Sequence, residues 1–374
     1  MLTPEEIAFF DEHGYVGPFD LSAPEQIAAA RHVVDTDLLT RESPIYGGRS
    51  GRDWHLASRA IYDLCAHPTI VERLVGLLGP DILLWRSQTF FKRPGDAETA
   101  WHQDYNFPGP FKIPSIDPPV TVTAWIALTE ATVENGCLEF VAGSHREGRL
   151  ETVKSADGEG IFGRNYKLER EVTEDDVVAK MTLSPGQFVL FSNLTVHGSG
   201  PNESDSTRFG VGVRFTSTDV RVYPDQTIDG QGMSLENFGC ILVRGEDRYG
   251  HNRMRKPPVA GVEATAARSA AEAAFVAGYR LGYTKGGRHA ERGIRVDVGE
   301  RAAALQSTLK AAMGYGGPAA YPEELRAGLV AGYADGVEGR PFDKRYGEHD
   351  AGRRKLPAPI RKLVRSALRR FKGR

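Results

Sequence analysis

The chain has 374 residues, of which 40 % are hydrophobic and 26 % are charged, and its formal net charge is −2. This length and balance are typical of one large or two ordinary globular domains with a sizeable buried core. The sequence contains no run of 18 or more apolar residues, which excludes a predicted membrane-spanning helix.

The cysteines and the amino-terminal residues narrow the class further. Cys65, Cys137 and Cys240 are scattered without CxxC spacing, which argues against a disulfide framework and against a zinc knuckle. Any metal is therefore expected to have nitrogen and oxygen ligands. The first thirty residues lack a basic start followed by an apolar run, so no secretory signal is predicted and a cytoplasmic location is expected.

Two helices are predicted at the start of the chain. Thr3 and Glu6 form a capping-box pattern, in which a threonine side chain and a glutamate three residues later satisfy each other's backbone N–H groups. The same pattern at Ser22 and Glu25 predicts the cap of a second helix, which runs through 27–34.

Short apolar segments separated by Gly, Pro and Asn turns follow, and they are typical of β-strands. The strand signals lie at 82–91, 120–130, 136–145, 186–197 and 207–215. Short strands with helices mostly in front of them predict a mainly β protein, an antiparallel sandwich or jelly roll flanked by helices.

Beyond Pro258 the composition changes to Ala, Gly, Arg and Glu with helical periodicity. The segments starting at Phe275 and Leu329 share the pattern VAGYxxG, and two copies are too few for a solenoid. We expect a first domain at 1–258 and a helical extension at 259–374.

The extension ends in a predicted basic amphipathic helix. Its apolar stripe and its basic residues are spaced for opposite faces of one helix over 360–372. Such a helix can lie on an anionic membrane, or it can dock on a partner subunit or on the acidic body of this chain. Binding to nucleic acid is not expected, because no stacking or groove-reading pattern accompanies the charge.

The stretch WHQDY contains the first candidate metal ligands, His102 and Asp104. In a β-strand, residues two apart share a face, so the two side chains can converge on one ion. His197 is predicted to end the apolar strand at 186–197 and supplies a third ligand. Two histidines and one carboxylate form the facial triad of non-haem Fe(II) oxygenases, although zinc and manganese remain open.

An arginine follows the distal histidine by eleven residues. In a strand, Arg208, Gly210, Gly212 and Arg214 share one face. An arginine on a face otherwise made of glycine has space beside it for a planar acid, which its guanidinium can hold with two parallel hydrogen bonds. The alternative is a surface ion pair, which contributes little to stability.

These motifs, in this order, resemble the phytanoyl-CoA dioxygenase family of Fe(II)- and 2-oxoglutarate-dependent oxygenases. The resemblance covers roughly residues 1–250, and it includes LTPEEIAFFDEHGYV at the start, FFKRPG before WHQD, and HGSG at His197. It implies a double-stranded β-helix of the jelly-roll, cupin-like type, a hydroxylase activity, and the use of Fe(II), 2-oxoglutarate and O2.

The resemblance also implies roles for particular residues. Iron would be held by His102, Asp104 and His197, and the distal carboxylate of 2-oxoglutarate by Arg208, with Gln88, Trp125 and Ser199 as further cosubstrate contacts. Relatives that chlorinate have a small residue in place of the carboxylate. Because Asp104 is present, hydroxylation or a related oxidation of a small molecule is expected.

The proline-rich segment 105–119 and the stretch 158–167 are candidate covers for the site. Substrate contacts are expected from Tyr105, Phe107, Phe111 and Lys112, unless these aromatic residues only seal the mouth of the barrel. Lys92, Arg93 and Lys112 are expected near that mouth and favour an anionic substrate. Two other functions remain open, a cupin-type metal enzyme that does not use 2-oxoglutarate and a non-catalytic binding protein on the same fold.

Overall fold

The computed structural model describes residues 1–46, 50–104, 115–154, 166–227, 229 and 233–259, isolated residues between 275 and 290, and 322–338. The helices are α1 (Pro4–His13), α2 (Pro24–Val33), α3 (Arg59–Cys65), α4 (Pro68–Leu78) and α7 (Pro322–Val337), with the shorter turns η1 (Val34–Leu38), η2 (Trp54–Leu56) and η3 (Ser144–Glu147). The strands are β1 (Tyr15–Asp20), β2 (Ile82–Lys92), β3 (Thr99–His102), β4 (Ile116–Asp117), β5 (Val122–Ala127), β6 (Leu138–Val141), β7 (Thr152–Lys154), β8 (Tyr166–Leu168), β9 (Val178–Met181), β10 (Gln187–Ser192), β11 (His197–Ser199), β12 (Arg208–Ser217), β13 (Arg221–Val222) and β14 (Ile241–Arg244).

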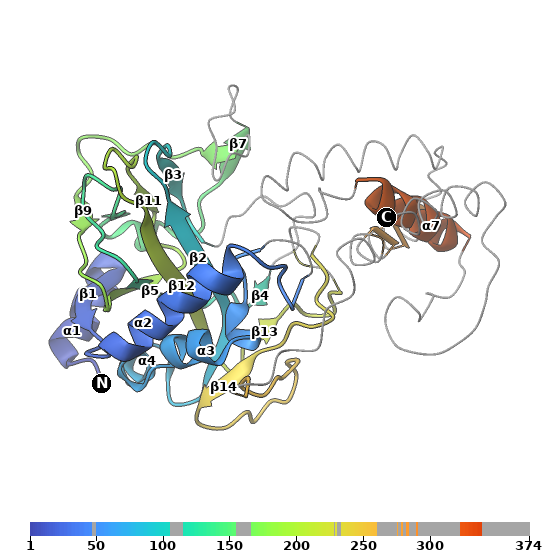
Figure 1. Cartoon of the computed structure of the whole chain (residues 1–374), viewed down its shortest axis with the longest axis horizontal. Helices are drawn as coiled ribbons and strands as arrows, with labels where there is room; N and C mark the ends of the chain where they lie inside the picture. Colours follow the sequence, from blue (N-terminus) through green and yellow to red (C-terminus); the bar gives the residue numbers. More distant parts are fainter. Residues whose placement is uncertain are drawn as a thin grey trace.

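Two antiparallel sheets form the body of the protein. The larger has the order β1-β10-β5-β12-β2-β14, and the smaller has the order β3-β11-β6-β9. Neighbours in each sheet come from distant parts of the chain, as in a jelly roll, and this confirms the predicted mainly β architecture. Figure 1 shows β12 and β2 running side by side through the centre of the larger sheet.

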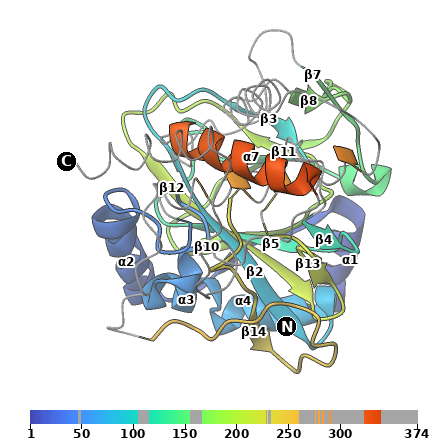
Figure 2. The ribbon, with the colours of Figure 1, turned by 90° about the vertical axis from the view of Figure 1, so that its right-hand side faces the viewer.

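Helices α2, α3 and α4 cover the outer face of the larger sheet (Figures 1 and 2). Their apolar side chains pack with outward-facing strand residues in one core, which includes Ile61, Leu74, Val211 and Phe215, all fully buried. Burying such residues stabilises the fold by about 1.5–3 kcal/mol each. The helices thereby hold the larger sheet from outside and leave its inner face for other contacts.

The amino-terminal prediction is confirmed for the first helix and wrong for the cap of the second. The capping box of α1 forms as expected, with Thr3 and Glu6 each bonding the other's backbone N–H. Helix α2 begins after Ala23 and has no side-chain cap. Ser22 instead has a positive φ of 52° and donates its backbone N–H to Asp20. A local hydrogen bond in the turn from β1 therefore replaces the predicted cap.

The predicted strand at 186–197 is in fact two strands. β10 ends at Ser192, and a turn leads to β11, which begins at His197 and belongs to the smaller sheet. The turn crosses from one sheet to the other, and an apolar run cannot reveal such a crossing. The other strand predictions correspond to β2, β5, β6 and β12.

The two VAGYxxG copies pack against each other through their glycines. A Cβ at Gly332 would stand 1.8 Å from the Tyr279 carbonyl oxygen, and one at Gly282 would stand 2.2 Å from the Leu329 carbonyl oxygen. Tyr279 also donates its hydroxyl to Asp335 at 2.6 Å. The repeat is therefore a close-packing motif of two helical segments.

Several predictions fall on residues outside the described ones. These are the substrate contacts at Tyr105, Phe107, Phe111 and Lys112, most of the stretch 158–167, and the basic helix at 360–372. Among the described residues, no helix is both long and apolar enough to cross a membrane. The three cysteines are buried and free of disulfides.

Candidate metal centre

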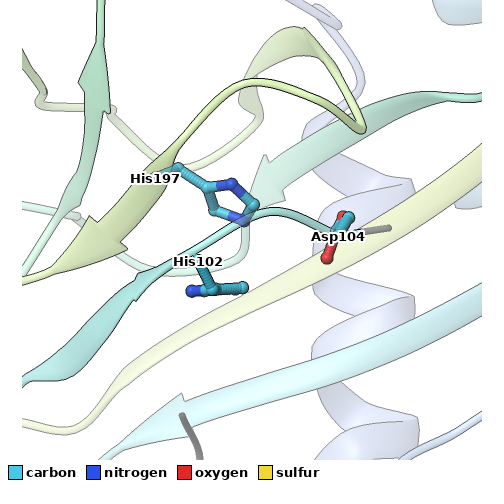
Figure 3. Close-up of side chains that lie close together, drawn as sticks. All are labelled: His102, Asp104 and His197. Atoms are coloured by element: carbon cyan, nitrogen blue, oxygen red, sulfur yellow. The ribbon is translucent and has the colours of Figure 1, made fainter. Parts of the chain in front are cut away.

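His102, Asp104 and His197 meet between the two sheets. Each offers one ligand atom, and these atoms all lie within 4.8 Å of one another. Figure 3 shows the two imidazoles projecting from neighbouring strands and the Asp104 carboxylate from the segment that follows His102. The predicted triad is therefore assembled as a cluster that fits one divalent ion.

The smaller sheet brings the two histidines together. His197 on β11 is the register partner of His102 on β3, and the ring centroids are 4.2 Å apart. β3 ends at His102, so Asp104 reaches the cluster from a turn and not from the strand expected. The intervening Gln103 anchors this turn, because its amide nitrogen donates to the carbonyls of Gly148 and Leu194.

Hydrogen bonds set the tautomer of both imidazoles. Nδ1 of His102 lies 2.8 Å from the Ala100 carbonyl oxygen, and Nδ1 of His197 lies 2.9 Å from that of Thr195. A carbonyl can only accept, so both Nδ1 atoms carry the proton and the lone pairs lie on Nε2. This is the usual second contact of a metal-binding histidine, and it suits the cluster to a metal.

Both histidines are neutral near physiological pH. Burial lowers the pKa of His102 to about 3, and the nearby His197 contributes in the same direction. Burial also lowers the pKa of His197. Only the neutral imidazole binds a metal, so the site is ready for an ion without a proton being removed from either ring.

Arg214 holds the aspartate, a contact that the sequence did not predict. Its Nη2 donates to Asp104 Oδ1 at 2.6 Å and its Nε to Oδ2 at 3.2 Å, while Thr123 donates to Oδ2 at 3.2 Å. Burial alone would raise the pKa of the Asp104 carboxyl, but the Arg214 charge and the two imidazoles hold it well below its usual range. Asp104 is therefore ionised and oriented.

Arg208 is a buried cation at the other end of the pocket. It is 4 % exposed, one Nη donates to the Gly136 carbonyl, and its Nε is buried with no hydrogen-bond acceptor. Burial lowers its pKa to about 10. No ion pair among the described residues includes it. A buried guanidinium with this surplus donor fits an anion bound in the pocket.

Part of the space beside Arg208, which the glycine face was expected to leave open for a planar acid, is filled by the Trp125 ring. The Trp125 ring on β5 packs over Gly210, where a Cβ would stand 2.1 Å from Trp125 Cζ2. The Arg208 guanidinium carbon lies 5.3 Å from the centre of the same ring. The glycines thus admit an indole, and the indole forms one wall beside the arginine.

Lys92 corrects another expectation. It is 5 % exposed and does not lie at the mouth, because its Nζ donates to Ser199 Oγ at 2.8 Å and to the Gly200 carbonyl. The Gln88 side chain is half-buried and donates to the Thr89 carbonyl at 2.9 Å. His55 is fully buried, and its Nδ1 lies 2.8 Å from Ser87 Oγ.

One pocket contains the three candidate ligands and the four expected cosubstrate contacts. It is lined by His102, Asp104, His197, Gln88, Trp125, Ser199 and Arg208, together with residues such as Arg214. These positions come from both sheets and span more than a hundred residues of chain. The fold therefore brings together every described residue for which a ligand or cosubstrate role was predicted.

Fold and pocket define a jelly-roll protein with a candidate mononuclear metal centre between its sheets. The model of the phytanoyl-CoA dioxygenase (PhyH) family matches residues 10–210, which is more than half of the chain. The chain belongs to this family, as its motifs predicted.

Individual relatives agree with this assignment. The peroxisomal phytanoyl-CoA dioxygenase of Rattus norvegicus is 27 % identical over 195 residues, covering 51 % of this chain and 54 % of that protein. A probable alpha-ketoglutarate-dependent hypophosphite dioxygenase of Stutzerimonas stutzeri is 30 % identical over 169 residues, covering 44 % and 56 %. The chain thus spans about half the length of these curated relatives.

A solved structure matches over more of its length. The structure described as CytC3 with Fe(II) and alpha-ketoglutarate is 31 % identical, with a TM-score of 0.57, and the match covers 72 % of this chain and 98 % of that one. Its described ligands are the metal and the keto acid that the motifs of this chain predict.

Proposed function

We propose that this protein is a non-haem Fe(II)- and 2-oxoglutarate-dependent dioxygenase that hydroxylates a C–H bond of a small molecule. The observation that carries the proposal is the pairing, in one pocket, of a His-Asp-His cluster with a buried arginine that has no carboxylate partner among the described residues. The CytC3 structure with Fe(II) and alpha-ketoglutarate supports the choice of metal and cosubstrate.

The residues that line the pocket divide into two groups, one that would bind the metal and one that would bind the cosubstrate. His102, Asp104 and His197 would hold Fe(II) on one face and leave the opposite positions open. Arg208 and Ser199 would bind the distal carboxylate of 2-oxoglutarate, with the Trp125 ring as a wall that excludes water. Bound Fe(II) and 2-oxoglutarate supply the oxidising chemistry, in which one O2 converts the cosubstrate to succinate and CO2 and adds one oxygen to the substrate.

Asp104 favours hydroxylation as the outcome. Because Arg214 and Thr123 fix both of its oxygens, the carboxylate stays directed into the pocket as the third ligand. That position is therefore not open to a halide. Substrate identity does not follow from these contacts, and the expectation that Phe107 and Lys112 touch the substrate remains a prediction.

The test is anaerobic addition of Fe(II) and then 2-oxoglutarate to the metal-free protein. We expect the weak visible charge-transfer band of a metal-chelated keto acid, its loss in Asp104→Ala, and a need for much more 2-oxoglutarate in Arg208→Ala. Metal binding without this band would contradict the proposal and favour a cupin-type metal enzyme that does not use 2-oxoglutarate. Failure to bind any divalent metal would favour the non-catalytic binding protein.

We also propose that residues 1–258 form the catalytic domain and 259–374 a separate extension. The family match ends at residue 210, inside the first part. A chain ending at Pro258 should keep metal and 2-oxoglutarate affinity, and loss of either would contradict the division. A cytoplasmic location stays a prediction.

For the predicted basic helix at 360–372, we propose that it docks on an acidic protein surface and does not bind a membrane. Flotation of the full chain with anionic liposomes, lost in a chain ending at Leu356, would contradict the docking.

A further inference from the structure

Lys92 is a buried cation behind the pocket, where it contacts the lining residue Ser199, and it has no role in the site as described so far. It stands at the end of β2, directly opposite Arg208 on β12. Its ammonium group donates to Ser199 Oγ at 2.8 Å and to the Ser199 and Gly200 carbonyls. All three acceptors belong to Ser199, the last residue of β11, and to Gly200, which are two and three residues after the candidate ligand His197.

The bond from Lys92 determines what the Ser199 hydroxyl can do. A lysine ammonium has only donors, so Ser199 Oγ must accept from it, and the single hydroxyl hydrogen remains to be donated elsewhere. Among the described residues, Ser199 donates this hydrogen to no acceptor, and its side chain lines the pocket that Arg208 also lines. The bond from Lys92 therefore leaves Ser199 with a hydroxyl donor available to a ligand in the pocket.

The positive charges of Lys92 and Arg208 also favour an anion bound at this end of the pocket. Lys92 and Arg208 are 5 % and 4 % exposed, and no ion pair among the described residues contains either of them. Burial lowers the pKa of Lys92 to about 8, and the neighbouring Arg208 acts in the same direction. Two adjacent buried cations disfavour each other, and a bound carboxylate would offset this cost for both.

We propose that Lys92 is a positioning residue for the distal carboxylate of 2-oxoglutarate, acting through the Ser199 hydroxyl that it orients and through its charge beside Arg208. This inference rests on the proposed function. It assigns two buried cations to the subsite for this carboxylate. Arg208 would contact the carboxylate directly, and Lys92 would act through Ser199. Lys92 is buried and turned toward Ser199, in contrast to the position near the mouth that was expected from the sequence.

The test compares two keto acids that share the chelating head, of which only one has a distal carboxylate. Mn(II)-loaded protein is titrated calorimetrically with 2-oxoglutarate and with pyruvate, which has the same chelating head but no distal carboxylate. Lys92→Met keeps the length and apolar stem of the side chain and removes its charge. We expect affinity for 2-oxoglutarate to fall about 10-fold or more, since a hydrogen bond to a charged group contributes about 1.5–3 kcal/mol. Affinity for pyruvate should change less than about twofold.

Ser199→Ala and the double variant separate an action through serine from a general loss of structure. Ser199→Ala should likewise weaken 2-oxoglutarate and spare pyruvate, and the double variant should be only slightly weaker than Lys92→Met. Ser199→Ala carries the test alone if Lys92→Met does not fold. Lys180→Met, which removes a half-exposed lysine paired with Glu139 at 3.5 Å, is the matched control and should change neither affinity.

Three results would overturn the proposal. They are unchanged 2-oxoglutarate affinity in Lys92→Met, equal weakening of both keto acids, and, for Ser199→Ala, unchanged 2-oxoglutarate affinity. If wild-type protein loaded with Mn(II) binds neither keto acid, the proposed function itself fails. That result is distinguishable, because the first three all require a wild-type protein that binds 2-oxoglutarate.

Discussion

Arg214 grips both carboxylate oxygens of Asp104 from 110 positions further along the chain, with the shorter contact at 2.6 Å. The pair is largely buried, with side-chain exposures of 13 % for the arginine and 6 % for the aspartate. An ion pair of this geometry does more than neutralise a charge. It fixes the direction from which the third candidate ligand meets the metal.

Replacing Arg214 with methionine should weaken metal binding without removing any ligand. Loss of a group that orients a metal ligand commonly reduces metal affinity by about 10- to 100-fold. Titration with Fe(II) or Mn(II) under anaerobic conditions measures the effect. Arg221→Met removes a half-exposed arginine that lies 3.7 Å from Asp225, and it should leave the affinity unchanged. Equal affinities for wild type and Arg214→Met would show that Asp104 needs no such support.

The same pair should show strong coupling in the metal-free protein. Asp104→Ala leaves the Arg214 charge buried and unpaired, which typically costs about 3–5 kcal/mol of unfolding free energy. The double variant Asp104→Ala/Arg214→Met removes both charges and should recover at least half of that loss. Urea unfolding in the presence of a chelator gives the free energies of wild type, Asp104→Ala, Arg214→Met and the double variant. A double variant as unstable as the sum of the two single changes would contradict the coupling.

Gly210→Ala should disturb the indole wall of the pocket. The new Cβ would meet Trp125 Cζ2 at 2.1 Å, so the ring must move, and overpacking of this kind costs about 1–3 kcal/mol. We expect lower stability together with weaker 2-oxoglutarate binding, measured by urea unfolding and by calorimetry. Gly212→Ala is the graded control, because its Cβ approaches Phe90 Cε2 only to 3.0 Å. A larger loss in Gly212→Ala than in Gly210→Ala would refute this packing argument.

His55 should make the protein sensitive to acid. Burial lowers its pKa to about 4, while an unfolded histidine titrates near 6.5. Between these values the unfolded chain binds the proton more readily, so stability is complete above about pH 6.5 and is lost as the pH falls toward 4. The full loss is roughly 3 kcal/mol, at about 1.4 kcal/mol per pKa unit.

The check for His55 is a comparison of unfolding free energies at pH 7 and pH 5. His55→Asn keeps a polar atom near Ser87 but cannot titrate, so its stability should fall by roughly 2 kcal/mol less than that of wild type over this interval. Identical pH dependence of the two proteins would show that His55 is not the titrating group. His102 and His197 are present in both proteins and cancel in the comparison.

Local patterns predicted much of the fold and the identity of the candidate ligands. The capping box at Thr3 and the strand alternation that places Arg208 and Arg214 on one face both depend on residues a few positions apart. The periodicity of the backbone alone determines such relations. The Ser22 cap failed because a competing hydrogen bond to Asp20, equally local, is the one that forms.

The candidate metal ligands separate what the sequence can predict from what only the tertiary structure decides. The sequence by itself determined which side chains could bind a metal and a carboxylate, because His102, Asp104, His197 and Arg208 stand in a recognisable order and spacing. Only the tertiary structure decided that Arg214 holds Asp104 and that Lys92 turns inward to Ser199. These contacts join residues about 110 positions apart, and their meeting depends on the order and register of strands in two sheets, which no local pattern encodes.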